Sequence, residues 1–514
     1  MSKTIIIIGA GLAGLSAALQ AAENGCNVKL VSSLPSERAQ SVMAEGGINA
    51  ALNTKDENDS PEEHFTDTIK AACGLADPNA VWGMTQAAPE LVHWLLKLGV
   101  KFNMSGYDDV DLRNFGGQKK KRTAFAQSDT GKQIMTAMID AVRRKEASGM
   151  VERFSHHSFL TLRLCGNICC GCVIRDEYSQ ETVELPGDAV IVATGGMHGL
   201  FGNTTGSLSN TGEVTAELFW LGVPLANGEM IQDHPTTVKC GGKRMLISEA
   251  ARGEGGRLFA MKDGKQWYFM EEKYPELGNL MPRDITAREI WKVSHESEVF
   301  LDMTEISEEI ISNKLSGLAD DCMTYLHKDI RKEPVSVLPG IHYFMGGILV
   351  DEQHRTPIQN LYAAGECCAQ YHGANRLGGN SLLGALYGGR VAAKSACEQA
   401  DVVDLSCATQ IDFPPASQIS EIKQLNKVMQ ETMGVVRNEN TLLNGIQTVQ
   451  ALTGNLPLLG MAVLKSALAR KESRGAHWRE DYPKSNDDDY LKTTVARFDG
   501  KQIQISFVPV PERR

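Results

Sequence analysis

A glycine motif close to the N-terminus, flanked by apolar segments, constrains the fold more than any other feature. Residues 5–8 read Ile-Ile-Ile-Ile, residues 9–14 read Gly-Ala-Gly-Leu-Ala-Gly, and an alanine-rich stretch at 15–24 precedes a second apolar run at 28–31. This order predicts a strand, a tight turn, a helix and a second strand, the βαβ unit that brings a dinucleotide pyrophosphate to a helix N-terminus. Ser32 stands where an acid usually binds the ribose, so the motif alone leaves NAD and FAD undecided.

Size and charge narrow the class of protein. The 514 residues are too many for one core and predict several domains. A net charge of -11 argues against nucleic acid as the main partner. No apolar run of about 18 residues exists and no secretory signal is visible, so we expect no membrane insertion and a cytoplasmic location.

The 12 cysteines are expected to be reduced thiols. The densest group is open to two interpretations, metal binding or packing. Packing is favoured and no metal site is predicted, because residues 166–167 form a turn between two strands and no second ligand cluster of matching spacing follows. This group consists of Cys165, Cys169, Cys170 and Cys172.

Two blocks in the middle of the chain combine arginine and histidine with glycine and hydroxyl residues. Arginine matches a carboxylate with a planar fork and keeps its charge, while glycine lets the backbone approach a ligand. The blocks therefore predict a pocket for a small dianion. The first contains His234-Pro235-Thr236, residues 248–256 and Pro282-Arg283-Asp284, and the second contains residues 342–347, Gly365-Glu366 and residues 372–382.

With these blocks in place, four further segments complete a resemblance that covers nearly the whole chain. The chain resembles the flavoprotein subunit family of fumarate reductases and succinate dehydrogenases, which also includes L-aspartate oxidase. This family binds FAD on the N-terminal motif and tolerates the serine at 32. The four segments are residues 39–50, 113–131, 190–196 and 472–477.

The resemblance implies an α/β fold in which a Rossmann-like FAD-binding domain is discontinuous. An α+β capping domain is inserted into it, and a helical domain and a short C-terminal tail follow. Pro414-Pro415 marks the end of the FAD domain, and apolar residues recur on one helical face from Ile419 to Met429. The expected divisions are 1–233 and 345–411 for the FAD domain, 234–344 for the cap, 412–472 for the helices and 473–514 for the tail.

The resemblance also implies chemistry. In reduction of fumarate, hydride leaves flavin N5 for one alkene carbon and an arginine protonates the other. Arg283 would be that acid, with Glu249 and Arg252 relaying protons to it. An arginine has a pKa far from working pH, but the carbanion it meets is a much stronger base and is stabilised by its charge. Substrate contacts are expected from His234, Ser248, His342, Arg376 and Phe115.

FAD contacts carry over in the same way. At 212–214 this chain has Gly-Glu-Val where the family usually has Gly-Asp-Gly, so Glu213 departs from the family pattern at this cofactor contact. The expected FAD contacts are Gly9, Gly11, Gly14, Ser32, Gly46, Gly47, Glu213, Glu366, Ser381 and Leu382.

Two positions discriminate within the family. Gln40 occupies the place of the histidine that links FAD covalently in many members, so non-covalent FAD is expected, which favours fumarate reduction. Phe115 stands where L-aspartate oxidase has a glutamate for the substrate ammonium, and a phenyl ring leaves that charge unpaired. The oxidase, which makes iminoaspartate for NAD biosynthesis, remains the alternative, and a non-catalytic FAD-binding assembly or RNA-modification factor is a remote one.

Electrons must reach the flavin from outside, because the chain has no C-x-x-C-H haem motif and no cluster ligands. The family often docks an iron-sulfur subunit, sometimes on a membrane anchor. The expected partners are therefore a C4-dicarboxylate substrate and an iron-sulfur subunit or another external electron donor, which would place the protein in the cytoplasm or at the membrane surface through that partner.

Overall fold

A five-stranded parallel sheet forms the centre of the N-terminal half. The computed structural model describes residues 2–107, 109–400 and 418–514. Ile5, Ile6 and Ile7 of the first strand are fully buried, because helices and a second strand layer cover both faces. The order is β20-β10-β1-β2-β6, so segments from three distant parts of the chain meet in one sheet. The strands are β20 (Leu361–Ala363), β10 (Ala189–Val192), β1 (Thr4–Ile8), β2 (Asn27–Ser32) and β6 (Val151–Ser155).

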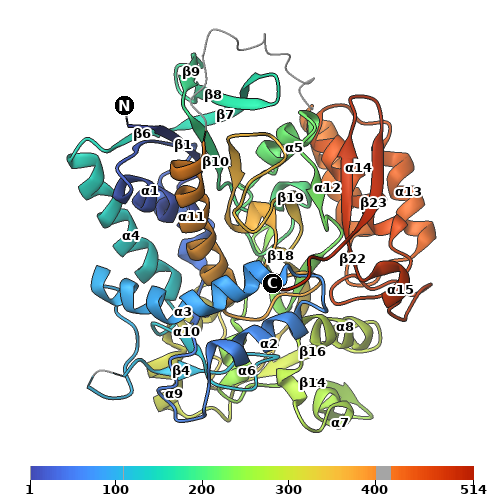
Figure 1. Cartoon of the computed structure of the whole chain (residues 1–514). Coiled ribbons are helices and arrows are strands. Elements are labelled where there is room, and N and C mark those ends of the chain that lie inside the picture. The colour runs from blue at the N-terminus through green and yellow to red at the C-terminus, as the bar shows by residue number, and fades with distance from the viewer. Residues whose placement is uncertain (1, 108, 401–417) are drawn as a thin grey trace.

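Helices with small residues pack tightly against this sheet. Figure 1 shows α1, α4 and α11 together beside β1. The contact between α1 and α11 is so close that a Cβ added to Gly389 would lie 2.2 Å from the carbonyl oxygen of Ala13. This explains the alanine-rich sequence that follows the glycine motif. These helices are α1 (Leu12–Glu23), α3 (Pro78–Leu98), α4 (Thr130–Ala147) and α11 (Asn380–Gln399), and α2 (Pro61–Ala71) packs on α3.

Residues 234–344, called the middle segment below, have a separate apolar core of their own. The expected division at 233/234 falls inside β12, which pairs with both β13 and β18. The division at 344/345 coincides with the end of β18. The strands are β12 (Ile231–Cys240), β13 (Lys243–Leu246), β14 (Arg257–Lys262), β15 (Lys265–Trp267), β16 (Val299–Asp302), β17 (Val335–Ser336) and β18 (Leu338–Phe344). The helices are α6 (Glu249–Gly253), α7 (Phe269–Lys273), α8 (Arg283–Val293), α9 (Glu308–Lys314) and α10 (Ser316–Asp321).

The C-terminal region lies on the right of Figure 1, where α12, α13 and α14 stand beside the β22–β23 hairpin. The fully buried Arg470 anchors it, with its Nε 2.8 Å from Glu229 and its Nη1 2.7 Å from Glu472. Breaking such a buried pair on one side typically costs about 3–5 kcal/mol. The expected division at 411/412 and Pro414-Pro415 lie outside the described residues. The elements are α12 (Ile419–Thr432), α13 (Glu439–Val449), α14 (Asn455–Ala469), α15 (Asp487–Tyr490), β22 (Lys492–Phe498) and β23 (Ile503–Pro509).

Smaller elements complete the fold. The cysteines at 169, 170 and 172 are buried within β8, and the described residues hold no group of three or more metal-ligating side chains arranged around one point. No helix within the described ranges has the length and apolar character needed to cross a bilayer. The elements are β3 (Ile48–Asn49), β4 (Leu112–Arg113), β5 (Thr123–Ala124), β7 (His157–Cys165), β8 (Ile168–Asp176), β9 (Thr182–Pro186), α5 (Glu213–Trp220), β11 (Leu225–Ala226), β19 (Gly347–Leu349) and β21 (Cys368–Ala369).

Candidate active site

One elongated cavity of about 570 Å³ joins the carboxyl ends of β1, β2 and β10 to the middle segment. This is the edge at which parallel α/β sheets bind ligands. Most of the residues expected from the sequence line it, so segments far apart in the chain converge on one space. The lining includes Gly9, Gly11, Ser32, Gly46, Gly47, Phe115, Glu213, His234, Ser248, Glu249, Arg283, His342, Glu366, Arg376, Ser381 and Leu382.

At one end, the cavity wall is backbone. Gly9 has a φ of +111°, and an added Cβ would lie 2.3 Å from the carbonyl oxygen of Ala193. Gly14 does not line the cavity but packs under it, since its Cβ would lie 1.8 Å from the oxygen of Gly9. Gly11 is different, with its nearest neighbour at 3.6 Å, and it faces the cavity as the N-cap of α1. The N-terminus of α1 therefore points its free N–H groups into open space.

The residues at this end fit FAD. The hydroxyl of Ser32 is buried and has no hydrogen-bond partner among the described residues, so a ribose hydroxyl would satisfy it. α1 carries no acidic residue in its first turn, which leaves its N-terminus free for a pyrophosphate. Glu213 opens α5 at the rim and is exposed, with its carboxylate accepting from Thr211 at 3.3 Å.

The middle of the cavity is a glycine turn held by an arginine. Gly47 has a φ of +137°, and an added Cβ would lie 2.5 Å from the oxygen of Ala124. Arg113 donates from Nε to the oxygen of Gly46 at 3.0 Å and from Nη2 to Gln127 at 3.1 Å. Ser381 and Leu382 approach from the first turn of α11. This turn provides a rigid backbone surface for a flat ring system.

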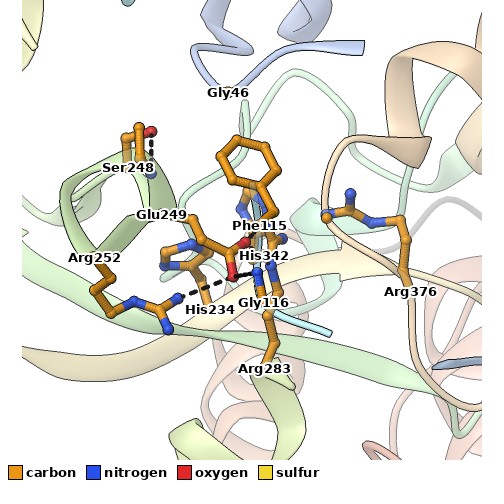
Figure 2. A network of polar contacts seen from close by, with 12 residues as sticks. Gly46, Phe115, Gly116, His234, Ser248, Glu249, Arg252, Arg283, His342 and Arg376 are labelled. Carbon is orange, nitrogen blue, oxygen red and sulfur yellow. Dashed lines mark hydrogen bonds and ion pairs between the residues drawn. The ribbon is translucent and has the colours of Figure 1, made fainter. Parts of the chain in front are cut away.

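At the other end, three charged side chains form a buried string. Figure 2 shows Glu249 between Arg252 and Arg283, with Phe115 above them. Glu249 Oε2 accepts from Arg283 Nε at 2.8 Å and from its Nη2 at 2.6 Å, while Oε1 lies 3.3 Å from Arg252 Nη2. Oε1 also accepts from the backbone of Gly116 at 3.1 Å. Burial opposes ionisation of Glu249, but Arg283 and Arg252 outweigh it and hold its pKa below the ordinary value.

Two histidines and a further arginine complete this end. The rings of His234 and His342 meet edge to face at 5.1 Å, and Arg376 lies on the far side of the network in Figure 2. Burial and then Arg283 lower the pKa of both histidines well below the ordinary value. Burial and Arg283 likewise lower the pKa of Arg376, to about 9. The unliganded site thus holds neutral histidines beside fixed cations.

Contacts orient these groups. His342 Nδ1 lies 2.7 Å from the hydroxyl of Thr205, and His234 Nε2 is buried without a partner among the described residues. Ser248 caps the short helix α6. Phe115 is only 2 % exposed, and its ring tip lies 3.0 Å from the position of a Cβ on Gly46. The ring therefore packs against the glycine turn.

Sequence reasoning missed two residues at the site whose polar side-chain atoms are buried, Gln232 and Glu45. Gln232 is fully buried on β12 two positions before His234, and a bulge interrupts the pairing with β18 between Gln232 and Asp233. Glu45 directly precedes Gly46 and is half-buried with its Oε2 enclosed, and burial followed by the charge of Asp321 raises its pKa to about 8. No local signal in the sequence marks either residue, and the bulge beside Gln232 interrupts the period-two alternation that would have related it to His234.

Comparisons with known proteins agree with this geometry. The FAD binding domain family matches residues 4–382, and the fumarate reductase flavoprotein C-terminal family matches residues 452–513. The succinate dehydrogenase flavoprotein subunit of Bacillus subtilis (strain 168) is 38% identical, covering 100% of this chain and 98% of that protein. The 8-methylmenaquinol:fumarate reductase flavoprotein subunit of Wolinella succinogenes is 32% identical, covering 100% and 92%.

A solved structure extends the comparison to the backbone. The quinol fumarate reductase of E. coli superposes with a TM-score of 0.90 at 27% identity, covering 99% of this chain and 97% of that one. The chain belongs to the fumarate reductase and succinate dehydrogenase flavoprotein family. It is accordingly a FAD-binding oxidoreductase of the class that acts on a CH–CH bond.

Proposed function

We propose that this protein interconverts fumarate and succinate and works mainly as a fumarate reductase. The observation that carries the proposal is the buried string Arg283–Glu249–Arg252. Arg283 and Glu249 line the same cavity as His234, His342 and Arg376, whereas Arg252 is not one of its lining residues and reaches it through Glu249. FAD, when bound, supplies the two-electron redox chemistry that adds hydrogen to a C–C double bond or removes it.

The charge of the site suits a dicarboxylate. Arg252, Arg283 and Arg376 contribute three positive charges and Glu249 one negative charge, which leaves a net charge of +2. Two carboxylates balance this charge. His234, His342, Ser248 and Arg376 are the proposed carboxylate contacts, and an arriving anion would draw protons onto the two neutral histidines.

Arg283 is the proposed proton donor. It opens α8 and is 6% exposed, so its guanidinium reaches the cavity while most of the side chain is enclosed. Glu249 holds two of its nitrogens and would return the proton after each turnover, and Arg252 stands next in line. Arg252 Nη1 donates to the oxygen of Asn279 at 2.7 Å, which fixes the far end of the string.

The proposed FAD contacts are those expected from the sequence, and we propose that the cofactor is not covalently linked. Gln40 lines the cavity where the linking histidine would stand, and its Oε1 accepts from the backbone of Ser207 at 2.7 Å. A glutamine amide cannot form the covalent link to flavin that a histidine ring nitrogen forms at this position. Loss of the covalent link supports the reductive direction.

The remaining parts of the proposal concern architecture and partners. We assign the middle segment as a capping domain inserted into a discontinuous FAD domain, because it has its own core and supplies the string of charges. Relatives are named as subunits, which supports docking to an iron-sulfur electron-transfer subunit and a cytoplasmic or peripheral location.

The test is anaerobic oxidation of reduced methyl viologen by the FAD-loaded protein with fumarate, with L-aspartate plus oxygen in parallel. Turnover with fumarate and none with aspartate is expected, because Phe115 offers an ammonium no partner. Iminoaspartate and peroxide from aspartate would identify the oxidase branch instead. Bound FAD with no activity on any C4-dicarboxylate would leave only a binding role.

A further inference from the structure

Gln232 is a buried amide placed between two of the site's cations. Its Oε1 accepts from Arg283 Nη1 at 3.1 Å and from Arg376 Nη2 at 3.0 Å. Its Nε2 donates to Asn375 Oδ1 at 2.9 Å and to the backbone oxygen of Arg376 at 3.0 Å. The side chain has no exposed surface. One oxygen therefore joins the two guanidinium groups that face the substrate end of the cavity.

The hydrogen-bond network fixes the orientation of this amide. Turning it over would place its NH₂ group against two guanidinium groups and its oxygen against two oxygens, leaving every group without a complementary partner. Two guanidinium groups repel each other in a buried site, and an amide oxygen offsets this repulsion without cancelling either charge. A carboxylate in its place would neutralise one of the charges that the substrate needs.

The contacts continue through the sequence neighbours of both arginines. Asn375 Nδ2 donates to Asp284 Oδ1 at 3.0 Å. Asp284 follows Arg283 at the start of α8, and Asn375 precedes Arg376 in the segment that leads into α11. Each arginine therefore has two links to this hydrogen-bond network. One is the bond from its own guanidinium to Gln232, and the other is the bond made by the residue next to it in sequence. The set also joins the middle segment to the segment before α11.

We propose that Gln232, Asn375 and Asp284 form a positioning bridge that sets the separation of Arg283 and Arg376 and so selects diacids of four carbons. The inference rests on the proposed function, because it assigns Arg283 and Arg376 to the substrate. The bridge residues themselves do not react. They keep the proton donor and the carboxylate contact at one distance, which a shorter or longer diacid does not match.

The experiment compares Gln232→Leu and Gln232→Glu with Gln370→Leu as the matched control. Gln370 is also a buried amide, but its Nε2 donates to the backbone oxygen of Asp351, whose side chain pairs with Arg355 rather than with Arg283 or Arg376. FAD content, melting temperature, kcat and KM for fumarate are measured. Binding of malonate, succinate and glutarate is followed by the change in flavin absorbance.

Gln232→Leu is expected to lower kcat about tenfold and to reduce the preference for succinate over malonate and glutarate by a similar factor. Gln232→Glu is expected to raise KM by about tenfold or more with a smaller change in kcat, because it removes one net positive charge. Gln370→Leu should match the wild type in kcat, in KM and in diacid selectivity. Selectivity and KM within about threefold of that control in both Gln232 variants would overturn the bridge.

A second pair keeps the test decisive if Gln232→Leu fails to retain FAD. Asp284→Asn preserves an oxygen for Asn375 and should remain within about threefold of the wild type, whereas Asp284→Leu should lose selectivity as Gln232→Leu does. Equal selectivity in both Asp284 variants would also reject the bridge. A wild type that turns over no fumarate would reject the proposed function and the bridge with it, whereas normal turnover with unchanged variants rejects the bridge alone.

Discussion

The two ends of the cavity are lined by different kinds of chemical group. The nucleotide end consists of glycines and backbone N–H groups on a parallel sheet, and tight packing of small residues fixes its shape. The substrate end consists of buried arginines, a glutamate and histidines from the middle segment and the segment before α11. Under the proposed function, the first end would bind the cofactor pyrophosphate through its shape, whereas the second would bind the substrate through charge and supply a proton.

This difference has an energetic side. The nucleotide end rests on the large apolar core formed around β1, α1 and α11, so damage to it should destabilise the fold together with the cofactor site. The substrate end concentrates like charges, and Arg376 Nε and His234 Nε2 are buried without hydrogen-bond partners among the described residues. Such unsatisfied groups disfavour the unliganded state and are satisfied when a ligand arrives. Damage there should spare FAD and remove turnover.

The largest effect is expected from a substitution that disrupts the packing of the nucleotide end. Gly14→Ala forces a Cβ to within 1.8 Å of the Gly9 oxygen, so we expect little folded flavoprotein. Gly11→Ala is the matched control, because its Cβ has 3.6 Å of space and extends only toward the cavity. That variant should fold and bind FAD more weakly. The ratio of flavin to protein absorbance and the melting temperature measure both, and equal behaviour of the two variants would contradict the packing argument.

The next largest effect is expected from a substitution at the substrate end, which should remove turnover. Arg283→Ala removes the proposed proton donor and should lower kcat for fumarate by about 10³-fold or more, with FAD content unchanged. Arg257→Ala serves as the control, since Arg257 lies in the same middle segment and pairs with Glu271 near the surface. Steady-state assays with reduced methyl viologen measure the change. Near-normal turnover in Arg283→Ala would remove this residue from the mechanism.

A smaller effect is expected from Glu45, which lines the cavity between its two ends. Burial and then Asp321 raise its pKa from 4.5 to about 8, with Asp129 adding to the rise and Arg113 and Ser248 opposing it. The folded protein therefore keeps this proton where the unfolded chain has lost it, so the contribution of Glu45 to stability falls as pH rises from about 4.5 to about 8.

Glu45→Gln should remove this dependence. The melting temperature of the wild type is expected to fall by a few degrees more than that of the variant between pH 6 and pH 9. Calorimetry at the two pH values measures the difference, and Glu37→Gln, at a partly exposed carboxylate, is the control. Parallel pH profiles for wild type and Glu45→Gln would show that the carboxyl is already ionised at pH 6.

The smallest effect concerns Gln40 at the flavin turn. Acid precipitation should release all flavin into the supernatant, since no covalent link is expected. Gln40→Ala removes the contact to Ser207 and should weaken FAD binding about three- to tenfold without affecting the fold. Fluorescence titration of the apoprotein with FAD measures this. Flavin retained in the precipitate would contradict the assignment of non-covalent FAD.

The nucleotide end could be predicted from residues 9–14 because a strand, a turn and a helix that are contiguous in sequence form it. The predicted strand at 28–31 and helix at 15–24 correspond to β2 and α1, with shifts of one to three residues at their ends. The substrate end could be proposed only through family resemblance. Arg283 and Arg376 are 93 residues apart, and no local sequence pattern predicts that both will donate to the same amide oxygen of Gln232.

The burial of charge was also beyond sequence reasoning. Arg470, Glu229 and Glu472 read as ordinary polar residues, yet all three are fully buried in one network. Burial of this kind depends on how α14 packs against β22, and periodicity along one helix does not report it. Glu45 was missed for the same reason, since its environment comes from α10 and β4 rather than from its neighbours in sequence.

The order of strands in the central sheet has a consequence for biosynthesis. β1 is completed by β10 and then by β20, so the sheet cannot close until residue 363 has left the ribosome. At about 5–20 residues per second, β10 waits roughly ten seconds or longer for its neighbour with an unpaired edge. Exposed parallel edges of this kind are prone to wrong pairing. The nascent chain therefore has a defined interval in which a chaperone, or FAD itself, would have the greatest influence on yield.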